Sequence, residues 1–129
     1  MSGAEKINIA IVDDDASLCN AMERLLRAAG FQSFTYPSAE AFLQDEGNVR
    51  PDCILLDIQL GGMSGFELQS LLAASGSTIP VIFITAYDDP ETRAQARQTD
   101  CIAYLRKNDP GDAVLEAIRK AVHFDKAKG

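Results

Sequence analysis

Acidic side chains directly follow two of the apolar runs in this sequence. The run "INIAIV" leads into Asp13, Asp14 and Asp15, and the run "CILL" leads into Asp57. Crowded carboxylates raise one another's pKa, and a divalent cation such as Mg²⁺, which takes oxygen ligands and several waters, relieves their repulsion. A carboxylate beside such an ion can attack phosphorus and form an acyl phosphate. The pattern therefore points to magnesium-dependent phosphoryl transfer onto an aspartate.

A hydroxyl group and an ammonium group follow two further apolar runs. Thr85 ends "VIFIT", and Lys107 follows "AYLR". A phosphoryl group in transfer carries negative charge on its oxygens, which a metal ion, a hydroxyl and an ammonium can stabilise. One such residue alone is usually a helix cap or a solvated charge, but the full set on four strand ends favours a site. Asp57, at a rigid strand terminus, is then the residue presented for phosphorylation.

The elements that must position these side chains follow from hydrophobic periodicity. Five apolar runs alternate with five helical patterns, and most of the runs are continuously apolar, which is typical of a parallel sheet covered on both faces. We predict strands over 7–12, 31–36, 53–56, 80–84 and 102–105, and helices over 18–29, 37–44, 66–74, 90–98 and 110–122. Such alternation predicts an α/β fold with a doubly wound, five-stranded parallel sheet in the flavodoxin-like order 2-1-3-4-5. Its carboxyl edge would gather the acids, the hydroxyl and the ammonium.

Several smaller assignments follow from local signals. Ser38 and Asp15 are expected to cap helices, and Asp88 with Asp89 should open the helix that starts near Pro90. The ends of the chain, "MSGAE" and "KAKG", are expected to be short solvated tails, and His123 a surface residue.

Composition limits the class of protein. A chain of 129 residues predicts a single domain over 1–129, and the net charge of −7 argues against direct binding to nucleic acid or to an anionic membrane. The three cysteines lack a metal-binding or disulfide spacing and are expected to be small core residues. Without a signal-peptide pattern or a bilayer-spanning apolar run, we expect a soluble cytoplasmic protein.

The combined motifs resemble the receiver domain of bacterial two-component response regulators, from "IAIVDDDASL" through "ILLDIQLGGMSGFEL" and "VIFITAY" to "AYLRK". The resemblance implies a role for each matching position: phosphoacceptor for Asp57; magnesium ligands for Asp13, Asp14, Asp57 and the backbone carbonyl of Gln59; phosphate binding for Lys107; switch hydroxyl for Thr85; and switch aromatic for Tyr104.

The same resemblance implies the partners. The phosphodonor would be a sensor histidine kinase, a phosphotransfer protein or a small acyl phosphate, and phosphorylation would change a partner-binding surface or cause homodimerisation. The domain would signal and not act as an enzyme on an external substrate. The "MSGFEL" segment is most similar to regulators of the nitrogen-fixation type, which carry a C-terminal DNA-binding domain that we do not expect within residues 1–129.

Two positions depart from the family pattern. Many members have proline where this chain has Gly61, and Lys-Pro where it has Lys107-Asn108. A cis bond before a residue other than proline costs about 2.5–4 kcal/mol. We therefore predict a trans Lys107–Asn108 bond, with the ammonium still able to reach Asp57.

Two other classes of protein share parts of the pattern. A phosphatase of the haloacid-dehalogenase type would use Asp13 and Asp15 of "IVDDDASL", but its last acidic motif should follow the lysine, and it gives Asp57 no role. A flavodoxin needs a loop rich in hydroxyl residues and glycine after the first strand, where this chain has three aspartates.

Overall fold

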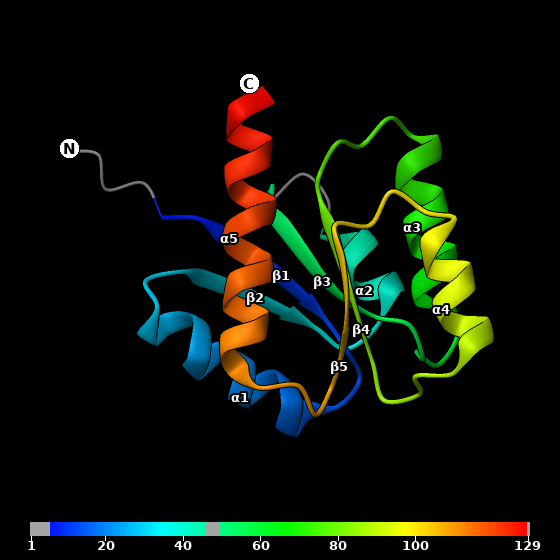
Figure 1. The fold of residues 1–129 in the computed structure, drawn as a ribbon, viewed down its shortest axis with the longest axis horizontal. Helices are drawn as coiled ribbons and strands as arrows, with labels where there is room; N and C mark the ends of the chain where they lie inside the picture. Colours follow the sequence, from blue (N-terminus) through cyan, green and yellow to red (C-terminus); the bar gives the residue numbers. More distant parts are fainter. Residues whose placement is uncertain (1–5, 46–49, 129) are drawn as a thin grey trace.

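A five-stranded parallel sheet forms the centre of the computed structural model, which describes residues 6–45 and 50–128, with side chains as far as His123 (Figure 1). Its strands are β1 (Asn8–Val12), β2 (Gln32–Tyr36), β3 (Cys53–Asp57), β4 (Val81–Thr85) and β5 (Ala103–Arg106). They lie in the order β2-β1-β3-β4-β5. The predicted topology is confirmed, and each predicted strand is found with its ends shifted by no more than one residue.

Five helices cover the sheet: α1 (Ala16–Ala28), α2 (Ala39–Gln44), α3 (Gly65–Ala74), α4 (Pro90–Arg97) and α5 (Gly111–Lys128). Helices α1 and α5 lie on one face, and α2, α3 and α4 lie on the other (Figure 1). Each face has its own apolar core, one around Leu26 and Ile118 and the other around Leu68 and Phe83. Because β3 and β4 are buried along their whole length between these cores, their ends are fixed in space.

The helix caps expected from the sequence are present. The Asp15 side chain accepts a hydrogen bond from the Leu18 amide at 3.2 Å, and Ser38 accepts one from the Ala41 amide at 3.0 Å. At α4 the capping residue is Asp89, whose carboxylate binds the Thr92 amide at 2.7 Å. Helix α3 begins with a capping box, formed by Ser64 and Glu67, that holds the helix start directly after the β3 loop.

The last helix is longer than predicted. Residues 126–128 of "KAKG", which were expected to belong to a solvated tail, are part of α5, which continues to Lys128. Alanine and lysine are good helix formers, and no glycine or proline interrupts the segment before Gly129. The other expected tail, "MSGAE", lies outside the described residues.

The burial of the cysteines and of His123 bears on the sequence predictions. Cys19 and Cys53 are buried as predicted, Cys101 is half-buried, and His123 is exposed. Within the described part of the chain, no helix is both long and apolar enough to cross a membrane.

Candidate functional site

The carboxyl ends of β1 and β3 bring three aspartates together. Val12 pairs with Leu56 in the sheet, so the next residues, Asp13 and Asp57, emerge side by side. Their exposed fractions are only 2% and 1%, whereas Asp14 is exposed to solvent. One carboxylate oxygen from each of Asp13, Asp14 and Asp57 lies within 4.8 Å of the others. The predicted acidic cluster is therefore present.

Lys107, which follows β5, reaches across the edge of the sheet to this cluster. Its Nζ atom lies 3.1 Å from Oδ2 of Asp57 and 3.0 Å from Oδ2 of Asp13. Burial of the ammonium opposes its charge, but hydrogen bonds to Asp13 and Asp57 and the charges of both carboxylates raise the pKa of Lys107 above its usual range. The lysine is therefore positively charged at neutral pH. The Lys107–Asn108 peptide bond is trans, as predicted.

Asp57 is harder to ionise than an ordinary aspartate. Burial, followed by the negative charge of Asp13, raises the pKa of Asp57 from 3.8 to about 6. The amide of Gln59, which donates to Oδ1 of Asp57 at 3.1 Å, and the ammonium of Lys107 act in the opposite direction. Asp57 is thus mainly ionised at pH 7. Additional positive charge beside it would stabilise this ionised carboxylate.

The donor set fits a hard divalent cation. Oδ1 of Asp13 accepts hydrogen bonds from the Asp15 amide at 2.8 Å and from Lys107 at 3.2 Å. Oδ2 of Asp13 is buried and accepts no hydrogen bond from the described residues, although Lys107 is within ion-pair distance. A carboxylate oxygen left without a hydrogen bond beside two further carboxylates is suited to Mg²⁺, which prefers oxygen ligands. Gln59, the fourth predicted ligand, is exposed and lies two residues after Asp57.

The loop that follows Asp57 passes very close to it. A Cβ atom added at Gly65 would collide with the backbone of Asp57 and Ile58, so only glycine lets α3 begin there. Gly62 has a φ of +78°, which also favours glycine, and the Glu40 carboxylate from α2 accepts from the Met63 amide at 3.0 Å. The role of Glu40 in holding this loop was not predicted.

The two predicted switch residues make their side-chain hydrogen bonds to the segment that follows β4. Thr85 is fully buried, and its hydroxyl accepts from the Tyr87 amide at 3.0 Å and donates to the Tyr87 carbonyl at 3.3 Å. Tyr104, on β5, donates its hydroxyl to Asp88 at 3.2 Å. Both residues therefore bind the loop between β4 and α4, and they contact it at adjacent positions.

Asp88, in the loop between β4 and α4, makes contacts that were not predicted from the sequence. It was expected to open α4 together with Asp89, but only Asp89 caps the helix. The side chain of Asp88 instead binds Arg93, Arg106 and Tyr104. The only signal in the sequence was an acid five residues before an arginine, and that signal says nothing about contacts to β5.

A doubly wound parallel sheet with an acidic triad and a lysine at its carboxyl edge defines the class of protein. The chain matches the family model of the response regulator receiver domain over residues 9–119. It therefore belongs to the response regulator receiver domain family, as the sequence motifs indicated.

Individual relatives agree with this assignment. The response regulator protein TmoT of Ectopseudomonas mendocina is 36% identical over 114 residues, which are 88% of this chain and 52% of TmoT. The solved structure of a response regulator receiver protein from Burkholderia phymatum is 40% identical, with a TM-score of 0.81 and coverage of 92% of this chain and 96% of that one. A structure titled FixJ-N is 28% identical, with a TM-score of 0.83 and coverage of 92% and 95%. The chain spans about half the length of curated relatives such as TmoT and TdiR.

Proposed function

We propose that this chain accepts a phosphoryl group on Asp57 and passes the signal on by changing its surface around α4 and β5. One observation carries the proposal: the ammonium of Lys107 contacts both the carboxylate of Asp13 and the buried carboxylate of Asp57 at the end of β3. Receiver domains take their phosphoryl group from histidine kinases, and the donor proposed here is a sensor histidine kinase or a phosphotransfer protein.

Mg²⁺ is the proposed cofactor, held by the carboxylates of Asp13, Asp14 and Asp57 and by the backbone carbonyl of Gln59. When bound, it would neutralise the charge that builds up between the carboxylates and the phosphoryl oxygens. The open side of the cluster is the side of Asp14, which is exposed and so leaves room for a donor to approach.

The protein's own groups have separate parts in the transfer. One carboxylate oxygen of Asp57 forms the new bond to phosphorus, and the bond from phosphorus to the donor's nitrogen or oxygen breaks, its electron pair leaving with the donor. Lys107, which is charged and already beside Asp57, moves its ammonium onto a phosphoryl oxygen. The amide of Gln59 holds Oδ1 of Asp57 through a hydrogen bond of 3.1 Å and so helps to fix the orientation of the carboxylate.

Thr85 and Tyr104 form the proposed switch. A phosphoryl group on Asp57 offers Thr85 a charged acceptor in place of the Tyr87 carbonyl, and charged acceptors make stronger hydrogen bonds. Departure of the Thr85 hydroxyl frees the Tyr87 backbone, so the β4–α4 loop can move and Tyr104 can turn inward.

The wider setting is also a proposal. We infer one receiver domain over residues 1–129, located in the cytoplasm, which signals without turning over an external substrate. Relatives twice as long carry further segments, so the response is read by a fused output domain or by a separate partner protein, with homodimerisation as one mode of response.

Incubation with a small acyl phosphate and Mg²⁺ tests the proposal. We expect one phosphoryl group per chain, removed by hydroxylamine as expected for an acyl phosphate, and none when the metal is chelated. A phosphatase of the haloacid-dehalogenase type would instead turn over a generic phosphate ester. That alternative is disfavoured because its second aspartate, Asp15, is engaged in capping α1. Steady turnover without a phosphorylated protein would contradict the proposal.

A further inference from the structure

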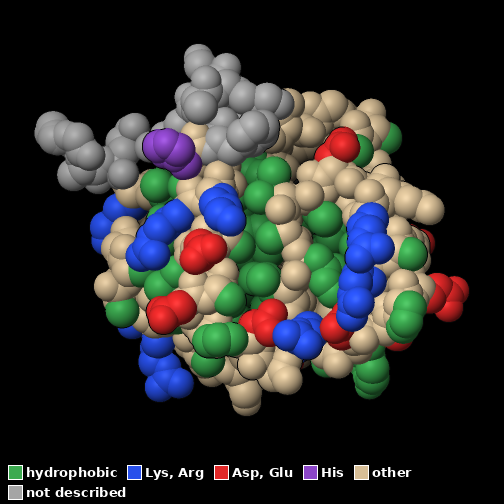
Figure 2. Space-filling view, in the orientation of Figure 1, with side chains coloured by type: hydrophobic (Ala, Val, Ile, Leu, Met, Phe, Trp, Pro, Cys, Tyr) green, Lys and Arg blue, Asp and Glu red, His purple; other side chains and the backbone are tan. Residues whose placement is uncertain are grey.

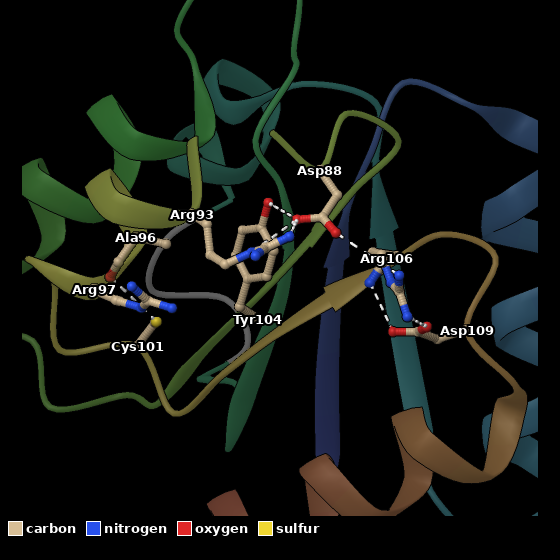
Figure 3. A pocket seen from close by; sticks show the side chains of 8 residues that line it. All are labelled: Asp88, Arg93, Ala96, Arg97, Cys101, Tyr104, Arg106 and Asp109. Carbon is tan, nitrogen blue, oxygen red and sulfur yellow. Dashed lines mark hydrogen bonds and ion pairs between the residues drawn. The ribbon is translucent and has the colours of Figure 1, made fainter. Parts of the chain in front are cut away.

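A surface hollow between α4 and β5 contains a carboxylate with an unusual number of partners (Figure 3). The hollow has a volume of about 520 Å³, and Asp88, Arg93, Tyr104 and Arg106 are among the residues that line it. In Figure 3 the Asp88 carboxylate lies between the Tyr104 hydroxyl, the Arg93 guanidinium and Arg106. The lining of the hollow therefore contains a network of polar and charged side chains that contact one another.

The contacts of Asp88 come from two different elements. Oδ1 accepts from Nε and Nη2 of Arg93, on α4, at 3.1 and 2.8 Å. The same oxygen accepts from the hydroxyl of Tyr104, on β5, at 3.2 Å. Oδ2 lies 3.8 Å from Nη1 of Arg106, the last residue of β5. The Asp88 side chain is only 19% exposed, so it joins α4 to β5 in a partly desolvated position.

A short path connects this network to Thr85. The Thr85 hydroxyl holds both the amide and the carbonyl of Tyr87, and Tyr87 is bonded directly to Asp88. Any movement of Thr85 that breaks these two hydrogen bonds loosens the backbone that fixes the Asp88 carboxylate. Asp88 therefore connects the proposed switch hydroxyl to the proposed switch aromatic through a continuous set of contacts.

We infer that Asp88 is a positioning residue that holds the Tyr104 ring in its resting place, and that phosphorylation of Asp57 releases the ring by displacing Asp88. This inference rests on the proposed function, since it names the contact through which that function is restrained. The Asp88 contacts are not needed to start α4, because Asp89 caps the helix and Pro90 occupies its first position. Removal of the Asp88 carboxylate can therefore separate the restraint from helix formation.

A double-mutant cycle on the rate of phosphorylation by an acyl phosphate tests the restraint. If the resting contact limits how often the phosphorylation-competent state forms, Asp88→Ala and Tyr104→Phe should each raise the rate by about fivefold, as expected for loss of one intramolecular hydrogen bond of typical strength. The double variant should be no faster than the faster single variant, because both changes remove the same contact. Multiplicative effects, or an unchanged rate in Asp88→Ala, would overturn the inference.

Asp100→Ala is the matched control. Asp100 is an exposed acid between α4 and β5, so its replacement removes the same charge from the same region without touching Tyr104. We expect its phosphorylation rate to equal that of the wild type. An equal acceleration in Asp100→Ala would assign the effect to net charge and overturn the positioning role.

Fluorine NMR of protein labelled with 3-fluorotyrosine tests the same contact without phosphorylation. The chain has three tyrosines, so the Tyr104 signal can be assigned by its loss in Tyr104→Phe. We expect Asp88→Ala to move the Tyr104 signal, and Asp100→Ala to leave it in place. A Tyr104 signal that is identical in the wild type and Asp88→Ala would refute the restraint. If the wild type cannot be phosphorylated but Asp88→Ala moves this signal, the proposed function fails while the resting contact stands.

Discussion

The carboxylate of Asp57 has a protonation equilibrium that differs between the folded and the unfolded chain. Its pKa is about 6 in the fold, through burial and the charge of Asp13, against 3.8 for a free side chain. Between these values the folded state binds more protons than the unfolded state. The free energy of unfolding therefore falls as the pH rises from about 4 to about 6, and the fold gains nothing from ionised Asp57 at pH 7.

Asp57→Asn should therefore stabilise the metal-free protein at pH 7. We expect a gain of about 1–2 kcal/mol, below the value of about 3 kcal/mol that two pKa units would give, because Lys107 loses a partner. The gain should shrink towards pH 4.5, where the wild-type carboxyl is protonated. Thermal unfolding in the presence of a chelator at both pH values measures this, with Asp100→Asn as a control of equal charge. A variant that is less stable at pH 7 would contradict the assigned pKa.

Metal binding should show the same titration. A proton on Asp57 competes with Mg²⁺, so the affinity should be nearly constant above pH 7 and should fall by up to about tenfold per pH unit below pH 6. Isothermal titration calorimetry from pH 5 to 8 would measure this dependence. An affinity that does not change over this range would mean that Asp57 is not a ligand.

At the scale of elements, hydrophobic periodicity was sufficient for the order and type of every strand and helix. Runs such as "CILL" and "PVIFI" are apolar on both sides because β3 and β4 lie between two cores. Periodicity gives no sharp end to a helix without a stop signal, which is why α5 was predicted to end too early. The capping residues Asp15 and Ser38 could be predicted because a cap depends only on the first turn of its own helix.

The junction between β3 and α3 depends on a glycine with no room for a side chain. Gly65→Ala would push the start of α3 away from the backbone of Asp57 and Ile58, at a cost of about 1–3 kcal/mol for overpacking, and should slow phosphorylation. Gly61→Ala is the matched control, since a Cβ there meets nothing within 4 Å and its φ is not positive. Chemical unfolding and acyl phosphate kinetics would measure both variants. Equal behaviour of the two would show that close approach at Gly65 does not position Asp57.

At the scale of the whole molecule, the sheet order determined which predicted site residues would meet. Asp13, Asp57 and Lys107 were expected together because the carboxyl ends of parallel strands share one edge, and they are found in contact. The Asp88 network could not be predicted, because its contacts depend on side-chain directions across β4, α4 and β5.

Basic side chains on the face that Figure 2 shows are interspersed with acidic ones, so the described residues there form no continuous basic surface.

Phosphorylation should alter one part of the molecule more than the rest. With Mg²⁺ and beryllofluoride as a phosphoryl mimic, we expect faster or slower amide exchange in the β4–α4 loop, in β5 and at the start of α5, within residues 85–122. Amides of β2 should be unaffected, because this strand lies beyond β1 and β3 from the proposed switch. Hydrogen exchange followed by mass spectrometry measures this. If the amide exchange rates of residues 85–122 were the same with and without the mimic, a switch in this segment would be contradicted.

The most direct test of the central claim is to locate the phosphoryl group. After reaction with an acyl phosphate and Mg²⁺, borohydride reduces an aspartyl phosphate to homoserine, which peptide mass spectrometry can assign to one position. We predict homoserine at position 57 alone, and none in Asp57→Asn. Homoserine at position 13 or 14, or a phosphoryl group that persists in Asp57→Asn, would contradict the assignment of Asp57 as the phosphoacceptor.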